Sequence, residues 1–293
     1  MVKRQKKDIV FDVVNYVLLI LIAFITIYPF YYILVISFNS GLDAARGGIY
    51  FWPRAFTLDN YRKIISDDKW VNAFGISVFR TVVGTALSVF FTSMVAYGLS
   101  YKKLLFRNGY YRILIFSMYF SGGLIPYYVL LRSLGLLNTV WVYIIPSLLS
   151  QFMVLIMISF FNEISPSLSE SAHIDGANDL QIFLKIILPI SKPVLATATL
   201  FAAVGHWNAW MDSAYYVSDS KLRTMSYLMM EIINRSQAAN VGDMQQNFRS
   251  ATNITTKSLQ AAVIIISTVP ILVTYPFLQK YFVKGIMLGS VKE

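Results

Sequence analysis

Six long apolar runs, separated by polar stretches, divide this chain. They cover about residues 13–38, 71–100, 113–131, 140–161, 193–216 and 258–282. A helix of about 20 apolar residues is long enough to cross the hydrocarbon layer of a bilayer. The pattern therefore predicts an all-α integral membrane protein, with six transmembrane helices in residues 13–282 and short ends at 1–12 and 283–293.

Two of the predicted spans contain residues that interrupt a regular helix. Gly122 and Gly123 lie with Pro126 in the third run, and Pro270 and Pro276 lie in the sixth. Broken helices are tolerated inside a membrane only where protein or a water-filled cavity surrounds them. We therefore expect these breaks to face protein or water.

The composition and the distribution of charge support this interpretation. The 293 residues are 56% hydrophobic and 14% charged, with a net charge of +10, whereas soluble domains typically have about 25% charged residues. Basic residues gather beside apolar runs, as in residues 1–12 and 101–112. This placement indicates cytoplasmic loops next to anionic lipid, and it argues against nucleic-acid binding. We expect both ends of the chain in the cytoplasm.

The residue types exclude several kinds of chemistry. The chain has no cysteine, and its two histidines, His173 and His206, are too far apart for an ordinary metal site. We find no phosphate loop of the form G-x-x-x-x-G-K-[ST], no H-E-x-x-H and no G-x-S-x-G. We therefore expect no catalytic residue, no metal site and no cofactor in this chain.

A polar stretch, residues 163–192, separates the fourth and fifth runs and predicts a first short helix. Ser167 and Glu170 stand as S-x-x-E, the spacing at which a serine hydroxyl and a carboxylate cap a helix start. Gly176 is expected to end this helix, because glycine readily adopts the left-handed conformation of a helix end.

The same stretch predicts a second short helix. Asn178 and Gln181 repeat the start signal as N-x-x-Q. Leu188-Pro189 is expected to end this helix, because proline has no amide hydrogen and clashes with the preceding turn. Together the signals predict a helix, a turn and another helix.

This stretch resembles the EAA loop of permease subunits from binding-protein-dependent ABC importers. The matching positions are Glu170, Ala172, Asp175, Gly176, Ala177, Phe183, Ile186, Leu188, Pro189 and Pro193. Ser171 departs from the pattern, which has a second alanine there. In that family the loop is a cytoplasmic coupling helix in a cleft of the ATPase. The resemblance thus implies a type I ABC importer permease fold, with every matched residue except Ile186 and Pro193 in ATPase coupling. An amphipathic hairpin lying on the membrane is the alternative.

The resemblance also implies partners and a location. These are a homologous second permease, two ATP-binding subunits that carry ATP and Mg²⁺, and an extracytoplasmic solute-binding protein, in a bacterial cell membrane. The end of the chain is similar to the tail of the second permease in maltose-type importers, which reaches toward the ATPase through positions equivalent to Gly289, Ser290, Val291 and Lys292. An ordinary disordered tail is the alternative there.

Candidate substrate contacts lie in the second and fifth runs. They are Arg80, His206, Trp207, Asn208, Trp210 and Asp212. Aromatic faces and polar hydrogen bonds bind sugars, and the segment Ser121–Tyr128 looks like one found in polysaccharide-type sugar permeases. Arg80 would suit an acidic sugar such as an alginate or pectin oligomer. Alternatively, the tryptophans anchor a helix at the interface, the polar groups join helices, and Arg80 snorkels or pairs with a carboxylate.

The source of energy separates the candidate functions. Ion-coupled carriers usually keep carboxylates near mid-membrane, but the first four runs contain none, and Asp212 is the one carboxylate in a span. We therefore expect a non-enzymatic permease for an oligosaccharide, driven by a separate ATPase. An ion-coupled carrier, a permease for a non-sugar solute and a non-transporting scaffold are the alternatives.

Overall fold

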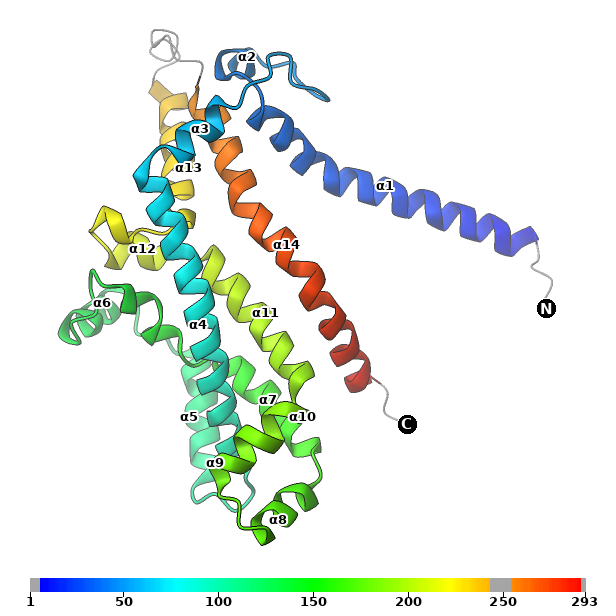
Figure 1. Ribbon diagram of the computed structural model, residues 1–293, viewed down its shortest axis with the longest axis vertical. Coiled ribbons are helices and arrows are strands. Elements are labelled where there is room, and N and C mark those ends of the chain that lie inside the picture. Colours follow the sequence, from blue (N-terminus) through cyan, green and yellow to red (C-terminus); the bar gives the residue numbers. More distant parts are fainter. Residues whose placement is uncertain (1–5, 243–253, 291–293) are drawn as a thin grey trace. The chain divides into compact units, whose positions relative to one another are not determined.

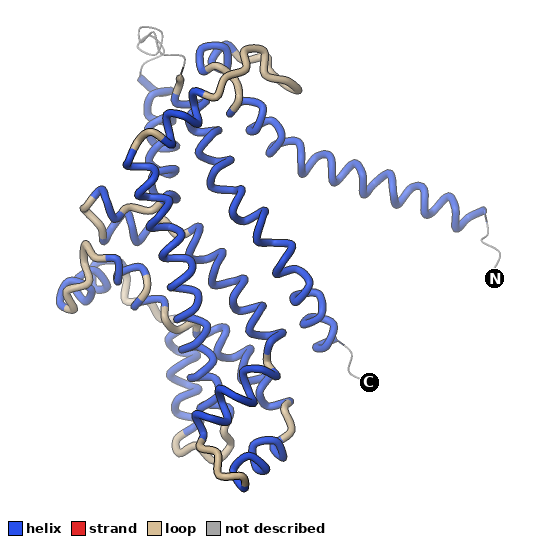
Figure 2. Tube along the Cα trace, viewed as in Figure 1, coloured by secondary structure: helices blue, strands red, loops and turns tan. Residues whose placement is uncertain are grey.

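The structure is a computed structural model, and it describes residues 6–242 and 254–290 of the chain. Figure 2 shows helices joined by loops and no strand in those residues. Asn39 and Phe56 form an isolated antiparallel β-bridge. Helices satisfy their own backbone groups, as lipid surroundings require. The predicted all-α class is confirmed.

The described residues fall into two compact units. The first is built from the residues up to Asp67 together with Glu231–Val269, and the second from Asp68–Met230 together with the residues from Pro270 on. The helices of the first unit are α1 (Lys6–Ser37), α2 (Gly41–Arg46), α3 (Asp59–Ile65), the later part of α13 (Met225–Gly242) and the first part of α14 (Thr256–Ser290).

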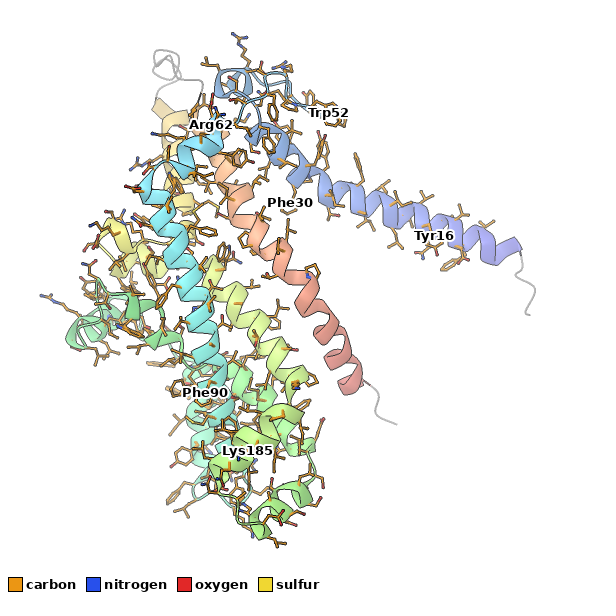
Figure 3. The ribbon with its side chains drawn as sticks, viewed as in Figure 1. Tyr16, Phe30, Trp52, Arg62, Phe90 and Lys185 are labelled. Carbon is orange, nitrogen blue, oxygen red and sulfur yellow. The ribbon has the colours of Figure 1, made fainter. Side chains whose placement is uncertain are left out.

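In the first unit, α1 is apolar and stands exposed. Tyr16 and Phe30 project from it into open space (Figure 3). The loop after α1 is fixed by polar contacts instead: Asn60 Nδ2 donates to the backbone oxygens of Ser37 and Asn39 at 2.9 and 3.1 Å, and Ser258 Oγ donates to Asn60 Oδ1 at 2.9 Å. These bonds satisfy the buried amide of Asn60 on both sides.

A half-buried carboxylate, Asp43, also stabilises this region. Asn39 Nδ2 donates to Asp43 Oδ2 at 2.9 Å, and the Arg54 guanidinium forms an ion pair with Asp43 Oδ1 at 3.1 Å. The hydrogen bond from Asn39 and then the one from Arg54 lower the pKa of the Asp43 carboxyl below its ordinary value. Asp43 therefore stays ionised at neutral pH and holds the loop after α2.

The second unit contains most of the helices. They are α4 (Asp68–Ser100), α5 (Arg107–Tyr119), α6 (Leu124–Ser133), η1 (Val140–Tyr143), η2 (Ile145–Ser147), α7 (Gln151–Glu163), α8 (Pro166–Ile174), α9 (Asp179–Ile182), the π-helical turn η3 (Phe183–Ile187), α10 (Leu188–Ile190), α11 (Lys192–Asn208), α12 (Met211–Tyr216) and η4 (Ser220–Leu222). The start of α13 belongs here too. The polar stretch between the fifth and sixth runs thus contains helix α13.

The core of the second unit lies where α4, α7, α11 and the π turn meet. Ala96 of α4 and Ala198 of α11 are buried with Val154 and Met157 of α7 and Phe183 of the π turn. Small residues let membrane helices approach closely. This packing positions the short helices α8 and α9 at one end of the unit, at the bottom of Figure 1.

Three stretches of the described chain are long and apolar enough to cross a membrane as single helices: Val10–Ser37, Asp68–Ser100 and Thr256–Thr274. Three more spans arise only if bent helix pairs count as one, with bends of 117° between α5 and α6, 44° before α7, and 84° between Asp179–Ile190 and α11. The third and fourth predicted spans are therefore not straight helices, and the 84° bend lies at Ser191, just before the fifth predicted span.

Each bend has a local cause. Gly122 and Gly123 separate α5 from α6, and Gly123 has a φ of +86°, which glycine adopts without strain. This break in the third span was expected and is confirmed. The interruption expected at Pro270 and Pro276 in the sixth span was wrong, because α14 is helical from Thr256 to Ser290 with both prolines inside it. In the fourth run, Pro146 lies in a 3-10 turn, and α7 begins only after Ser150, whose side chain caps it. The 84° bend lies at Ser191, between Pro189 and Pro193, and the fifth run is interrupted after Asn208, where α11 ends.

Candidate functional site

The first candidate surface is the hairpin of α8 and α9, and its start differs from the prediction. Pro166 occupies the first helical position, with Ser165 before it. Ser167 Oγ lies 2.8 Å from Ser165 Oγ and does not form a capping box with Glu170. Proline has a fixed φ suited to the first turn and lacks the amide that would need a cap, so the helix starts there. The predicted cap at Ser167 was wrong by two positions, because Ser165 precedes the first helical residue.

The end of α8 follows the prediction. Gly176 has a φ of +84°, and its N–H donates to His173 O at 3.0 Å while Ala177 N–H donates to Ala172 O at 2.9 Å. This pair of bonds is a Schellman motif, which satisfies the last carbonyls of a helix and needs a left-handed residue. Gly176 therefore ends α8 and turns the chain.

The start of α9 is also as predicted. Asn178 Oδ1 accepts from Gln181 N, and Gln181 Oε1 accepts from Asn178 N, both at 2.9 Å. These bonds form a complete capping box. His173 Nε2 lies 3.4 Å from Asp179 Oδ1, so a side-chain contact also joins the two helices across the turn.

The end of the second helix differs from the prediction. The chain stays helical through Pro189 to Ile190 because it widens into a π turn, in which Leu188 N–H donates to Phe183 O five residues back. A wide turn loosens the i to i−4 ladder, and this is where a proline does least damage. The change of direction comes at Ser191, two residues after the expected end.

The structure divides the eight predicted coupling residues into three groups by burial. Ala172 and Phe183 are buried, and Phe183 stacks on Tyr97 with ring centroids 5.3 Å apart. Ala177 and Leu188 are half-buried. The remaining four are exposed: Glu170, Asp175, Gly176 and Pro189. The buried members fix the hairpin to the helices behind it, and the exposed members form its surface.

That surface also carries apolar residues that the sequence analysis missed. Ile174, next to the turn, is 87% exposed, and Leu168 of α8 and Leu180 of α9 are exposed as well. Exposed apolar side chains that gather on one surface mark contact sites for a partner. Ile174 is a single apolar residue among polar neighbours, so no apolar pattern in the sequence marks it as a contact residue. It is exposed because it lies at the turn where α8 ends.

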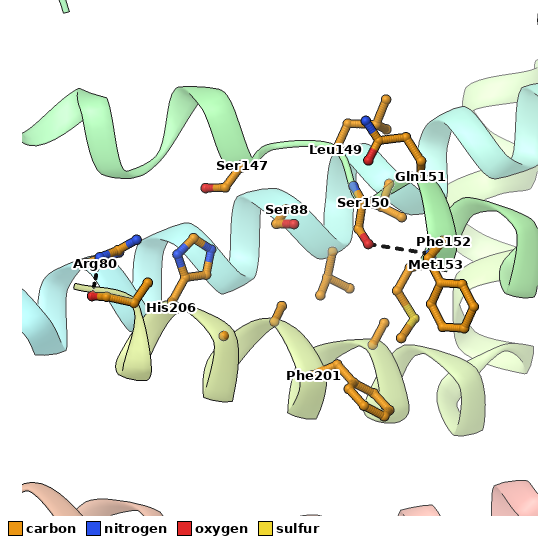
Figure 4. A pocket seen from close by; sticks show the side chains of 16 residues that line it. Arg80, Ser88, Ser147, Leu149, Ser150, Gln151, Phe152, Met153, Phe201 and His206 are labelled. Carbon is orange, nitrogen blue, oxygen red and sulfur yellow. Dashed lines mark hydrogen bonds between the residues drawn. The ribbon is translucent and has the colours of Figure 1, made fainter. Parts of the chain in front are cut away.

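The second candidate site is a cavity of about 460 Å³ in the second unit. Residues of α4, α11 and the segment from Ser147 to Met153 form its walls (Figure 4). The wall carries five polar side chains besides the charged end: Ser88, Thr92, Ser147, Ser150 and Gln151. Arg80 and His206 lie together at one end of the cavity in Figure 4. These polar residues occur singly within apolar runs, so no pattern in the sequence indicates that they line one cavity.

Arg80 is held by several groups. Its side chain is 3% exposed and forms an ion pair with Asp212, and Nη1 donates to Ala209 O at 3.0 Å. The guanidinium carbon lies 4.8 Å from the centroid of the Tyr143 ring. Arg80 Nε is buried without a hydrogen-bond partner among the described residues. The expected alternative that Arg80 pairs with a carboxylate is therefore the arrangement observed.

The structure separates the other predicted path residues. His206 is buried against Gly84 and lines the cavity. Trp207 is buried with its ring edge toward Phe74, and it lines a different, apolar cavity. Asn208 is exposed, and Trp210 and Asp212 are half-buried; none of the three lines the polar cavity. Of the six predicted path residues, Arg80 and His206 line the polar cavity, and Asp212 joins them through its ion pair with Arg80.

Two other predicted segments have simple positions. The segment Ser121–Tyr128 contributes to a cavity of about 530 Å³ at the bend between α5 and α6, where Tyr127 packs against Tyr216 with centroids 5.8 Å apart. Gly289 and Ser290 lie in the last turn of α14. Val291 and Lys292, with the rest of the tail, lie outside the described residues. No group of histidine, aspartate and glutamate suited to a metal ion occurs in the part of the chain that the structure describes.

Comparison with known proteins identifies relatives over nearly the whole length. The family described as "Binding-protein-dependent transport system inner membrane component" matches residues 88–288. Protein LplC of Bacillus subtilis (strain 168) is 42% identical over 290 residues, with 99% of this chain and 97% of LplC covered. The polygalacturonan/rhamnogalacturonan transport system permease protein YtcP of the same strain is 41% identical over 286 residues, with 98% and 99% covered.

A solved structure agrees with this. A chain from a bacterial ABC transporter involved in the import of the acidic polysaccharide alginate superposes with a TM-score of 0.84 at 30% identity. The match covers 96% of the present chain and 100% of the other. Similarity of this extent covers both the hairpin and the cavity.

Proposed function

We propose, because this chain belongs to the family of binding-protein-dependent transport system inner membrane components, that it is the permease subunit of an ATP-driven importer of oligosaccharides. The names of two similar proteins include acidic polysaccharides: one is a polygalacturonan/rhamnogalacturonan transport system permease, and the other belongs to a transporter involved in alginate import. The chain itself supplies a membrane passage and no hydrolytic site, so it acts as a transport subunit rather than an enzyme.

The exposed hairpin of α8 and α9 is the observation that carries the proposal. Ile174 and the acidic residues Glu170 and Asp175 surround a rigid turn closed by a Schellman motif and a capping box. A preorganised turn with an exposed apolar anchor suits a cleft in a partner protein, because little ordering is needed on binding. The ATPase implied by the family is the partner that this surface fits.

The remaining assembly follows from the same membership. A second homologous permease completes the passage, two ATP-binding subunits hold ATP and Mg²⁺ on the cytoplasmic side, and a solute-binding protein delivers substrate from outside. This topology puts both chain ends and the hairpin in the cytoplasm. The tail around Gly289 and Ser290 then points toward the ATPase side.

The hairpin provides the route from ATP to the passage. ATP binding would close the ATPase dimer and draw the two coupling hairpins together, and the bend at Ser191 connects this hairpin directly to α11. α11 forms one wall of the polar cavity. Movement of the hairpin would therefore reshape the wall that the substrate passes.

Replacement of Ile174 by alanine tests the coupling surface. Truncating an apolar anchor in an interface commonly costs about 2 kcal/mol or more, equivalent to about a 30-fold loss of affinity. We expect this loss when purified ATP-binding subunits are titrated onto the permease in lipid nanodiscs. Gly176→Val should abolish ATP hydrolysis stimulated by the loaded binding protein, because valine disfavours a positive φ.

Ser167→Ala is the matched control on the same helix, since among the described residues its hydroxyl is hydrogen-bonded to Ser165 Oγ. Its binding and stimulated hydrolysis should equal those of the wild type. Normal stimulation in both Ile174→Ala and Gly176→Val, with normal membrane insertion, would reject the coupling role. Uptake that persists without any ATP-binding subunit and collapses with an ionophore would instead indicate an ion-coupled carrier.

A further inference from the structure

We propose that the polar cavity beside Arg80 is a binding subsite for one acidic sugar unit, with the sugar carboxylate at Arg80 and its hydroxyls along the serine-rich wall. This inference rests on the proposed import function and specifies the chemistry of the substrate. Its volume of about 460 Å³ lies within the range of about 300–1,000 Å³ typical of small-molecule sites.

The charges at the cavity favour an anion. Arg80 is the charged residue that lines it, and none of its lining residues is Asp or Glu. Asp212, the counterion of Arg80, is not among those lining residues. The ion pair therefore makes a buried arginine tolerable in the membrane while the cavity wall itself remains free of acidic groups.

Arg80 also has a hydrogen-bond donor that is unused among the described residues and that a ligand would reach only after the side chain turns. Its Nε is buried and has no partner among the described residues, although Nη1 and Nη2 are both engaged. A buried donor without an acceptor costs about 1–3 kcal/mol. A ligand carboxylate would remove this cost, and guanidinium groups bind carboxylates in a fixed planar geometry.

The rest of the wall suits a sugar ring. Ser147 Oγ already donates to the backbone, so its oxygen is left as an acceptor for a sugar hydroxyl. Gln151 adds an amide with both donor and acceptor. Phe152 and Phe201 are 58% and 57% exposed, and Figure 4 shows both away from the Arg80 end. Aromatic faces of this kind pack on the apolar side of a sugar ring.

Uptake of a matched pair of sugars tests the subsite. The importer, assembled with its partner subunits in vesicles, is offered a galacturonate trimer and the same trimer with its carboxyls reduced to alcohols. The double variant Arg80→Gln/Asp212→Asn removes both charges without leaving one unpaired. We expect it to lower the ratio of acidic to neutral uptake by about tenfold or more, because hydrogen bonds to charged groups are worth about 1.5–3 kcal/mol.

Two further variants keep the test decisive if the double variant does not assemble. Ser88→Val and Gln151→Leu keep the Arg80–Asp212 pair but remove polar groups from the wall, and each should slow uptake of both trimers several-fold. Thr85→Val is the control, since Thr85 lines the apolar cavity instead; its uptake of both trimers should be normal.

The outcomes separate the two proposals. A wild-type complex that imports neither trimer overturns the oligosaccharide function and the subsite with it. A wild type that imports only the neutral trimer, a ratio unchanged in the double variant, or normal uptake by Ser88→Val and Gln151→Leu overturns the subsite and leaves the import function standing.

Discussion

Among single residues, Gly84 and His206 form one of the tightest contacts between α4 and α11. A Cβ atom at position 84 would lie 2.7 Å from His206 Cε1 and 2.8 Å from Nε2, closer than atoms can pack. Overpacking of this kind typically costs about 1–3 kcal/mol. We therefore expect Gly84→Ala to lower the unfolding temperature of the purified protein in detergent.

Gly98 on the same helix gives the matched control. A Cβ atom there would have nothing within 4 Å, so Gly98→Ala should be neutral or raise stability by about 0.5–1 kcal/mol. His206→Ala combined with Gly84→Ala should recover part of the loss, since it removes the ring that the new methyl group meets. Equal unfolding temperatures for Gly84→Ala and Gly98→Ala would contradict this contact.

The sequence could identify Arg80 as unusual but not its partner. A lone charge in an apolar run suggests either a path residue or a neutralised one, and the choice depends on which carboxylate lies nearby. Asp212 is far away in sequence and reaches Arg80 only because α11 packs along α4 and then breaks after Asn208. Tertiary packing of this kind leaves no mark in local residue patterns.

Among the short elements, α9 depends on its capping box. Asn178→Ala removes the acceptor for Gln181 N, and loss of such a cap typically costs about 1 kcal/mol. We expect faster amide hydrogen exchange in residues 179–182. Ser167→Ala should leave exchange in α8 unchanged, because Ser167 lies inside that helix and caps nothing. Similar effects of both substitutions would show that the box does not stabilise the hairpin.

The hairpin shows which local signals are reliable. Gly176 and the Asn178–Gln181 pair were predicted correctly, because left-handed φ and reciprocal capping are decided by neighbouring residues. The predictions for Ser167 and Pro189 failed because a second signal competed with each. Pro166 is a better first residue than Ser167, and the π turn before Pro189 absorbs the proline.

At the scale of the whole molecule, the absence of cysteine makes the topology directly testable. A cysteine introduced at Asn178 should react with an impermeant maleimide only after cells are permeabilised. One introduced at Trp52, which is 77% exposed in the loop after α2, should react in intact cells. Positive charge in the short acid-poor loops favours this orientation. Reaction of the Asn178 variant in intact cells would rule out contact with a cytoplasmic ATPase.

The lengths of the apolar runs predicted the all-α class but not the directions of the helices. Run length alone identified α4 and the apolar part of α1, because one unbroken helix fills each run. The bend of 117° occurs at Gly122 and Gly123, and the bend of 84° occurs at Ser191, between Pro189 and Pro193. The composition of a segment indicates whether lipid or water surrounds it. The direction of a helix depends on the helices that it packs against.

The bend of 84° at Ser191 connects the hairpin to α11, so that movement of the hairpin would rotate α11. α11 has 17 residues, which corresponds to an arm of about 25 Å, and the backbone carbonyl that holds Arg80 lies just past its far end, at Ala209. A small push on the hairpin would swing that carbonyl relative to α4. Nucleotide binding to the ATPase and substrate binding near Arg80 would then be thermodynamically linked. Each would change the affinity of the other by the same factor.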